Sequence, residues 1–378
     1  MTENFNVKKT SEVMPKKILP LVKVGMPPRE QLMPELEKVL YGEVIAEGDN
    51  VYRFESEFAR IFRLPFALGT SSGTGALHIA LLLAGIIPGD EVITTSMTAE
   101  PTNTVILQCG AKPVFADVDS ETGNLDPQSV ESLITSRTKA ILVVHYAGFP
   151  ANLRELRRIA DQYGIQLIED CAHALGASYS SDSIGTIGDY AIFSLQAIKH
   201  MTTVDGGILT MQDPNKLDKA RKLRWFGMAK GVPRTEVNIE HVGFKYNMHN
   251  VSATIGLAQL EAIESRVKRH IDNGRFFDKT ISALPGLNVT RIDPECQPSY
   301  WLYTVLSEDS QAVERCLAGI GVSASKLHRP NHYHSIFAPM RRPLPGLDTY
   351  YRRLTHIPCG WWVSDEDRES IVYALRKG

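Results

Sequence analysis

One lysine in the sequence has surroundings that suggest covalent chemistry. Lys199 lies five residues after Ser194, near the end of the apolar run Tyr190–Leu195. A lysine amine held in a partly desolvated pocket has a lowered pKa, and it can attack a carbonyl group to form a Schiff base. A lysine taken alone is far more often a solvated surface charge, so its neighbours decide the interpretation.

Two carboxylates and a histidine follow another apolar run. Glu169 and Asp170 end the run Gln166–Asp170, and His173 comes three residues after Asp170. A carboxylate at the end of a buried strand can pair with a protonated ring nitrogen. Taken alone, the acidic pair is more readily interpreted as a helix cap or a surface ion pair.

A segment rich in glycine and hydroxyl groups precedes a third apolar run. Residues 69–78 read GTSSGTGALH, and the run Ala76–Ala84 is expected to be helical. The free N–H groups at a helix N-terminus bind anions, most often phosphate. No lysine follows the glycines, and their spacing is not that of a dinucleotide-binding loop, which excludes both common nucleotide motifs. An ordinary strand-to-helix turn is the alternative.

The order of these signals is more informative than any one of them. The glycine-rich loop comes first, the acid follows, and the serine and lysine come roughly 25 to 30 residues later. Pyridoxal 5'-phosphate (PLP) needs a phosphate cradle, a carboxylate that keeps its pyridine nitrogen protonated, and an amine for its aldehyde. The ordered set therefore predicts a PLP enzyme.

An alternation of strand-like and helix-like segments must position these groups. Asn152–Tyr163 has apolar residues on one helical face and charges on the other. Such alternation predicts an α/β fold with a mainly parallel mixed sheet flanked by helices, in which ligands bind beyond the carboxyl ends of the strands. The predicted strands are Glu91–Thr95, Pro113–Val118, Ala140–His145, Gln166–Asp170, Tyr190–Leu195 and Gly207–Met211.

The pattern changes after about residue 260. A long charged helical stretch, Ala262–Leu284, leads into sequence rich in proline and aromatic residues. We therefore predict a polar N-terminal tail over residues 1–20, a large cofactor-binding domain over 21–260 and a smaller α+β domain over 261–378.

Composition excludes several classes of protein. The chain of 378 residues has 41 basic and 43 acidic residues, so nucleic acid is not an expected partner. The apolar runs are too short to span a bilayer, and the N-terminus lacks the apolar region of a signal peptide. The five cysteines are not spaced for a metal, which favours reduced thiols and a cytoplasmic location without a metal site.

Several motifs, in this order, resemble the DegT/DnrJ/EryC1/StrS sugar aminotransferases, which belong to the fold type I (aspartate aminotransferase-like) PLP enzymes. The resemblance covers roughly residues 20 to 378. The segments that carry it are Ile45–Gly48, Ser72–His78, Glu169–His173, Ser194–Lys199, Asp205–Gly207 and Gly243–Met248.

The resemblance implies a role for each candidate residue. Lys199 should hold the cofactor as an internal aldimine, Asp170 should meet the pyridine nitrogen, and His173 should lie near the phenolic oxygen. Family members form homodimers with shared active sites, in which Lys245 or Asn247 should reach the neighbouring subunit's site. The expected phosphate ligands are Gly73, Thr74 and Ser194.

The sequence departs from the family pattern in positions that contact ring or substrate. Ala99 stands where an aromatic residue usually stacks on the cofactor ring, so either another side chain, such as Met97, covers the ring or the site is more open there. Gln196 replaces a histidine before the lysine. These departures affect the substrate assignment more than the cofactor assignment.

The implied reaction transfers an amino group from L-glutamate, through the pyridoxamine form (PMP), to a keto-sugar linked to a nucleotide. Synthesis of polysaccharide or secondary-metabolite sugars is the implied context. Alternatives are a sugar dehydratase, an amino-acid transaminase or a non-enzymatic PLP-binding regulator; the dehydratase branch has histidine in place of Lys199. Candidate sugar contacts are Tyr300, Trp301, Arg329–His334, Trp361 and Trp362.

Overall fold

The computed structural model describes residues 18–377. Most of the predicted polar tail, residues 1–17, lies outside the described residues. Leu19, near the end of that prediction, pairs with Val322 in an isolated bridge and is buried among residues of the C-terminal part. The start of the described chain is therefore fastened to the part of the protein that lies last in the sequence.

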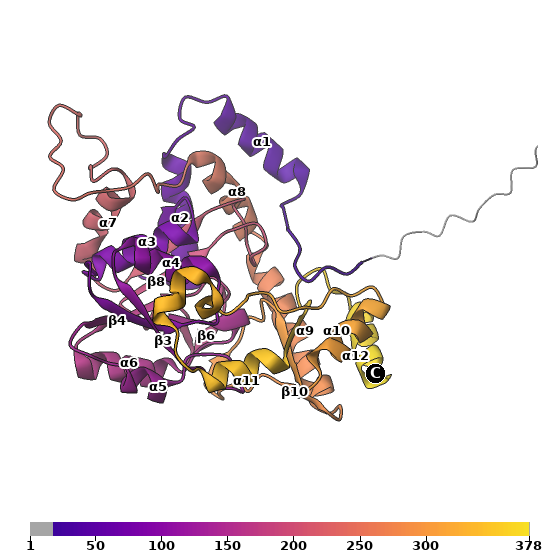
Figure 1. The fold of residues 1–378 in the computed structure, drawn as a ribbon. Helices are drawn as coiled ribbons and strands as arrows, with labels where there is room; N and C mark the ends of the chain where they lie inside the picture. Colours follow the sequence, from indigo (N-terminus) through magenta and orange to yellow (C-terminus); the bar gives the residue numbers. More distant parts are fainter. Residues whose placement is uncertain (1–17, 378) are drawn as a thin grey trace, which may run out of the picture.

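The centre of the molecule is a sheet of seven strands in the order β1-β9-β8-β5-β4-β2-β3 (Figure 1). All neighbours pair in parallel except β9, which runs antiparallel to β1 and β8. This confirms the predicted mainly parallel mixed sheet. The strands are β1 Leu68–Thr70, β2 Glu91–Thr95, β3 Lys112–Ala116, β4 Thr138–Val144, β5 Gln166–Asp170, β8 Tyr190–Ser194 and β9 Gly207–Met211.

Helices cover both faces of this sheet because its strands are apolar on both sides. On one face, alternate strand residues such as Ile141 and Leu167 pack with α2 (Asp49–Phe62), α6 (Leu153–Tyr163) and α8 (Asn250–Leu260). On the other face, residues such as Leu142 and Ile168 pack with α3 (Gly73–Leu83), α4 (Glu100–Gln108) and α7 (Leu217–Arg224). The short helix α5 (Pro127–Ser132) packs with α6, and α1 (Arg29–Leu40) packs against α8.

The strand ends that matter for chemistry meet at one edge. Asp170 and Ser194 end β5 and β8, which are neighbouring parallel strands. Because β9 is antiparallel, its first residue, Gly207, pairs with both Thr70 and Ser194 at this same edge. The reversed strand thus brings Gly207 next to the glycine-rich loop that contains Thr70.

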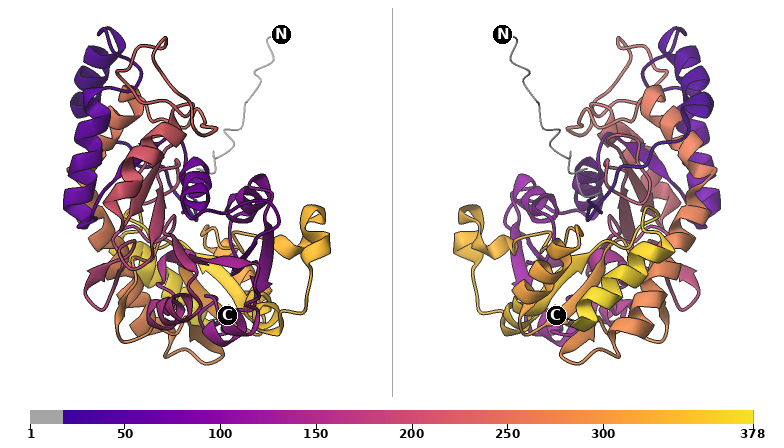
Figure 2. Two further views of the ribbon diagram at one scale, coloured as in Figure 1. Left: turned by 90° about the vertical axis from the view of Figure 1, so that its left-hand side faces the viewer. Right: turned by 90° about the vertical axis from the view of Figure 1, so that its right-hand side faces the viewer.

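The C-terminal part is built around a three-stranded antiparallel sheet, and its core also includes residues of the large part such as Phe115 and Tyr146. The order is β10 (Leu287–Val289), β12 (Tyr303–Ser307) and β13 (Leu354–Ile357). In Figure 2 its elements, in orange and yellow, lie mostly in the lower half of the molecule. A second small sheet joins β6 (Ser178–Tyr179), β7 (Asp182–Ser183) and β11 (Cys296–Gln297). The helices of this part are α9 (Ile263–Ile281), α10 (Ser310–Gly319), α11 (Pro345–Arg353) and α12 (Asp365–Lys377).

None of the helices described between residues 18 and 377 combines the length and apolar character that crossing a membrane would need.

Candidate active site

A cavity of about 300 Å³ lies at the edge where the strand ends meet. The large sheet and its loops form most of its wall, and the C-terminal part adds Trp301 and His328. Six of the eight residues predicted for the site line this cavity: Gly73, Thr74, Asp170, His173, Ser194 and Lys199.

The N-terminus of α3 opens into this cavity. Ser72 caps the helix, since its Oγ accepts a hydrogen bond from the Gly75 N–H at 3.0 Å. The helix starts three residues earlier than the sequence pattern indicated, so Gly73 and Thr74 occupy its first turn, where backbone N–H groups have no partner within the helix. A methyl group on Gly207 would lie 2.5 Å from the Ser72 carbonyl oxygen and 2.6 Å from the Gly73 nitrogen. Only glycine allows this close approach.

Asp170 presents a buried carboxylate to the cavity. Its Oδ2 accepts a hydrogen bond from the Thr102 hydroxyl at 2.9 Å, and its Oδ1 accepts one from the Ala172 N–H at 3.1 Å. Burial raises the pKa of Asp170, whereas these hydrogen bonds and the charge of Lys199 act in the opposite direction. Each oxygen therefore keeps a lone pair for a further donor inside a water-poor site.

Lys199 lines the same cavity, and its side chain is half-buried. Burial lowers the pKa of Lys199 from 10.5 to about 7, and the negative charge of Asp170 partly offsets this effect. Its Nζ lies 3.9 Å from the centre of the Trp301 ring. A large fraction of the amine is therefore neutral near pH 7, as a nucleophile requires.

His173, Trp301 and His328 form an aromatic wall. The rings of His173 and Trp301 stack at 4.1 Å, and the His328 ring lies parallel to His173 at 5.7 Å. Trp301 is fixed by its Nε1, which donates to the Ile198 carbonyl oxygen at 2.9 Å. Burial lowers the pKa of His173 far below its usual value, so its imidazole is neutral. Its Nδ1 is buried and has no partner among residues 18–377.

Lys245 and Asn247 do not line the cavity of their own chain. Lys245 is exposed, and its Nζ lies 3.8 Å from the centre of the Trp225 ring. Asn247 is bridged to Thr70, and its buried Oδ1 has no partner among the described residues. Both residues lie on the segment that, according to the resemblance, should reach into the active site of a neighbouring subunit.

The departures from the family pattern have different structural outcomes. Ala99 and Gln196 line the cavity. Met97 does not, because it is completely buried in the core of the C-terminal part. Among the proposed sugar contacts, Trp301 lines the cavity, but Trp361 and Trp362 pack near Gly25 and Pro20 instead.

Thr102 and His328 are among the cavity residues that were not predicted from the sequence. Thr102 lies within α4, and His328 lies in a loop of the C-terminal part. Neither residue directly follows a strand of the large sheet. The rule that ligands bind beyond the carboxyl ends of the strands, which identified Asp170 and Lys199, therefore could not identify them. The hydrogen bond from Thr102 to Asp170 depends on how α4 packs beside β5.

The lining residues fit PLP. The α3 N-terminus, packed tightly against Ser194 and Gly207, suits a phosphate. Asp170 offers acceptor oxygens for a protonated ring nitrogen. The buried Nδ1 of His173 has no partner among the described residues, and the phenolic oxygen of PLP would supply one. The amine of Lys199 suits the aldehyde.

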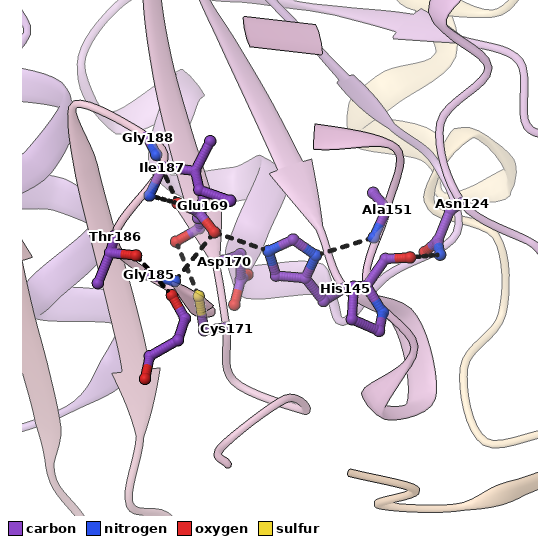
Figure 3. Close-up of polar contacts among 12 residues, drawn as sticks. Asn124, His145, Ala151, Glu169, Asp170, Cys171, Gly185, Thr186, Ile187 and Gly188 are labelled. Carbon is purple, nitrogen blue, oxygen red and sulfur yellow. Dashed lines mark hydrogen bonds and ion pairs between the residues drawn. The ribbon is translucent and has the colours of Figure 1, made fainter. Parts of the chain in front are cut away.

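Potential metal ligands also form a group outside the cavity. Ligand atoms of His145, Glu169 and Cys171 lie within 4.8 Å of one another (Figure 3). Both nitrogens of His145 and both oxygens of Glu169 already take part in hydrogen bonds. Burial also raises the pKa of the Cys171 thiol well above its usual value, which disfavours the thiolate that a metal needs. This donor set does not suit a metal ion.

Comparison with known proteins agrees with this geometry. A model of the DegT/DnrJ/EryC1/StrS aminotransferase family matches residues 28–376. The spore coat polysaccharide biosynthesis protein SpsC of Bacillus subtilis is 32% identical over 360 residues, which are 90% of this chain and 92% of that protein.

Two crystal structures are similar over nearly their whole length. AtS13 from Actinomadura melliaura has a TM-score of 0.92 and 34% identity, covering 97% of this chain and 100% of that one. The sugar aminotransferase CalS13 from Micromonospora echinospora has a TM-score of 0.92 and 33% identity, covering 96% and 100%. The chain therefore belongs to the DegT/DnrJ/EryC1/StrS aminotransferase family and is a PLP-dependent aminotransferase of fold type I.

Proposed function

We propose that this enzyme transfers the amino group of L-glutamate to a keto-sugar carried by a nucleotide. The observation that carries the proposal is the cavity itself, which places the buried amine of Lys199 and the carboxylate of Asp170 beside an aromatic wall. Such walls stack on sugar rings. The names of CalS13, a sugar aminotransferase, and of SpsC, a polysaccharide biosynthesis protein, support a sugar as acceptor.

Lys199 is the proposed acid–base group. When bound, PLP supplies an electron sink and carries the amino group between donor and acceptor as its amine form. The neutral amine of Lys199 would take the proton from the donor's α-carbon and pass it to the cofactor. Its pKa of about 7 suits proton transfer in both directions near neutral pH. In the second half-reaction, the same amine moves a proton in the reverse sense.

The remaining lining residues hold and orient. Asp170 would keep the pyridine nitrogen of bound PLP protonated, the first turn of α3 and Ser194 would hold its phosphate, and His173 would share a hydrogen bond with its phenolic oxygen. Trp301 and His328 lie where they can contact the acceptor sugar. Walls from both parts of the chain also exclude water from the reacting groups.

The absorbance spectrum with and without glutamate tests this function. The purified enzyme should show a band at about 410–430 nm that shifts to about 330 nm on adding glutamate, because the cofactor passes to its amine form. Nucleotide-linked keto-sugars should then restore the first band. Restoration by 2-oxo acids alone would point instead to an amino-acid transaminase.

The Lys199→Ala variant provides the first prediction. It should bind PLP without the Schiff-base band and should lose turnover, because no other amine lines the cavity among residues 18–377. Turnover is followed as amino-sugar formation from glutamate. Full activity in a folded Lys199→Ala protein would contradict the assignment of this lysine.

We further propose a homodimer with shared sites, located in the cytoplasm. Several large apolar side chains are exposed, among them Tyr41, Ile45 and Val242, of which Tyr41 and Val242 are 87% and 80% exposed. A second copy of the chain would cover them. The exposed Lys245 lies on the same stretch of chain as Val242. All five cysteines are unpaired, which agrees with a reducing compartment.

Mixed dimers test the sharing of sites. Lys199→Ala subunits and Lys245→Ala subunits are each expected to be poorly active. When mixed in equal amounts, half of the dimers combine both variants, and each of these has one intact site, so activity should return to about a quarter of the wild-type value. Asn247→Ala is mixed in the same way to decide which residue crosses. No recovery with either partner would contradict sites shared through this segment.

A further inference from the structure

A buried histidine and a buried glutamate lie directly behind Asp170. Glu169 precedes Asp170 on β5 and points to the opposite face of the sheet, because side chains alternate along a strand. His145 follows β4, the neighbouring strand, and its backbone N–H donates to the Asp170 carbonyl oxygen at 3.2 Å. Both side chains are completely buried, and neither lines the cavity.

The carboxylate of Glu169 meets donors on every side. Its Oε2 accepts hydrogen bonds from His145 Nε2 at 3.1 Å and from the Gly185 N–H at 3.0 Å. Its Oε1 accepts from the N–H groups of Ile187 and Gly188 at 3.1 and 2.5 Å (Figure 3). One side chain therefore satisfies three backbone donors of the loop that leads into β8.

The contacts of His145 fix its tautomer. The Ala151 N–H donates to His145 Nδ1 at 3.1 Å, and a backbone N–H can only donate. The ring proton must therefore be on Nε2, from which it is directed at Glu169. The imidazole thus links Glu169 to the segment between β4 and α6.

The pair joins the segments that carry the site. The loop 185–188 leads directly into β8, which ends at Ser194. The segment 146–151 packs against the aromatic wall. A methyl group on Gly148 would lie 2.7 Å from the backbone nitrogen of Trp301 and 3.0 Å from the His173 carbonyl oxygen. Any shift of this segment would therefore move His173 and Trp301 as well as β5.

We propose that His145 and Glu169 are positioning residues: together they fasten the end of β5 so that the Asp170 carboxylate stays directed into the cavity. The inference rests on the role proposed above for Asp170. The main chain supports it as well, because the backbone N–H of His145 holds the Asp170 carbonyl oxygen while its side chain holds Glu169. Neither residue touches the reacting atoms.

Cofactor binding to the apoenzyme tests the proposal. Glu169→Gln keeps the size of the side chain but turns amide hydrogens toward backbone donors, and His145→Leu removes the donor to Glu169. Both should raise the Kd for PLP about 10-fold to 100-fold, the range known for outer-shell partners of ligating groups. Visible circular dichroism per bound cofactor should fall, because the ring is held less rigidly.

Two further variants serve as matched controls. His145→Gln restores an N–H donor close to the position of Nε2, so it should recover most of the affinity and dichroism. Cys171→Ala changes the third member of the group, whose thiol donates to the Glu169 carbonyl oxygen at 3.9 Å and packs in the apolar core, and should bind PLP like the wild type. Thermal unfolding of each apoenzyme confirms that the measured protein is folded.

A purely structural role would lower the unfolding temperature and leave the Kd and dichroism of the folded protein unchanged, and that result would overturn the proposal. Equal losses in Cys171→Ala, or no recovery in His145→Gln, would also overturn it. If Glu169→Gln fails to fold, the His145→Leu and His145→Gln pair decides. A wild-type enzyme without a visible band would instead contradict the proposed function.

Discussion

At the scale of single residues, Asp170 and Lys199 form an electrostatic pair in a buried cavity. Burial raises the pKa of the carboxyl and lowers the pKa of the amine, and each group's charge opposes the shift of the other. A protonated ring nitrogen at Asp170 would satisfy the carboxylate and leave the amine neutral. The chemistry therefore depends on a cost that the folded protein bears before any cofactor binds.

Replacing Asp170 separates its charge from its shape. Asp170→Asn keeps the hydrogen bond from Thr102 but cannot hold a ring nitrogen in its protonated form. We expect PLP to bind, with kcat reduced about 100-fold or more, as for other preorganised electrostatic contacts. Single-turnover absorbance measurements with glutamate check this, and Thr102→Ser, which keeps the hydroxyl, is the control. An unchanged rate would remove Asp170 from the ring nitrogen.

At the scale of elements, the site depends on how closely three of them approach. β9 starts with Gly207 against the first turn of α3, and Gly73 lies against Ser194 at the end of β8. The phosphate site is thus formed by backbone contacts among α3, β8 and β9. Between α3 and β9 there is no space for a Cβ atom.

A glycine substitution tests this packing. In Gly207→Ala, the new methyl group would lie 2.5 Å from a backbone oxygen, so the α3 N-terminus must shift. Overpacking of this kind costs about 1–3 kcal/mol, and we expect the Kd for PLP to rise about 10-fold or more. Isothermal titration of the apoenzyme measures it. Gly319→Ala, where no described residue lies within 4 Å of the new methyl group, is the control and should bind normally.

At the scale of the whole molecule, buried basic groups make the stability of the apoenzyme depend on pH. Their pKa values are lower in the folded state than in the unfolded chain, so the unfolded chain binds more protons and stability falls as pH falls. Lys199 acts between pH 10.5 and about 7. Histidines act below about 6.5, the usual histidine pKa: His173, His200, His270, His328 and His356.

Buried cysteines, whose thiol pKa values are raised, act in the opposite direction as pH approaches 9. We therefore expect the difference in the free energy of unfolding between wild type and Lys199→Met to decrease from pH 9.5 to pH 7.5 by about 1.4 kcal/mol per pH unit at most. Both proteins should lose further stability below pH 6.5. Urea denaturation of the two apoenzymes measures both effects. A constant difference above pH 7.5, with flat profiles below pH 6.5, would show that these groups titrate alike in the folded and unfolded states.

Much of the site was predictable because parallel sheets obey a local rule. Asp170 and Ser194 follow short apolar runs, and the carboxyl ends of neighbouring parallel strands meet at one edge. The spacing from Asp170 to Lys199 was therefore enough to place an acid and an amine in one cavity. The six predicted strands agree with the structure to within two residues at either end, since their apolar character is encoded by adjacent residues.

Other features depend on contacts that no short pattern encodes. β1 is a three-residue strand, too short for a periodic signal, and the reversal of β9 depends on its pairing with β1 and β8. The departure of Met97 from the cavity reflects the C-terminal core that encloses it. The positions of Lys245 and Asn247 outside the cavity likewise follow from the path of a long connection.

The sequence by itself determined the cofactor chemistry: a lysine, an acid and a phosphate loop in an order that a parallel sheet converts into proximity. Only the tertiary structure decided what surrounds that chemistry. Trp301 and His328 reach the cavity because the C-terminal part packs on the edge of the large sheet, more than 100 residues after Lys199. The physical reason is range: strand periodicity acts over a few residues, whereas the walls of the cavity are set by packing between distant segments.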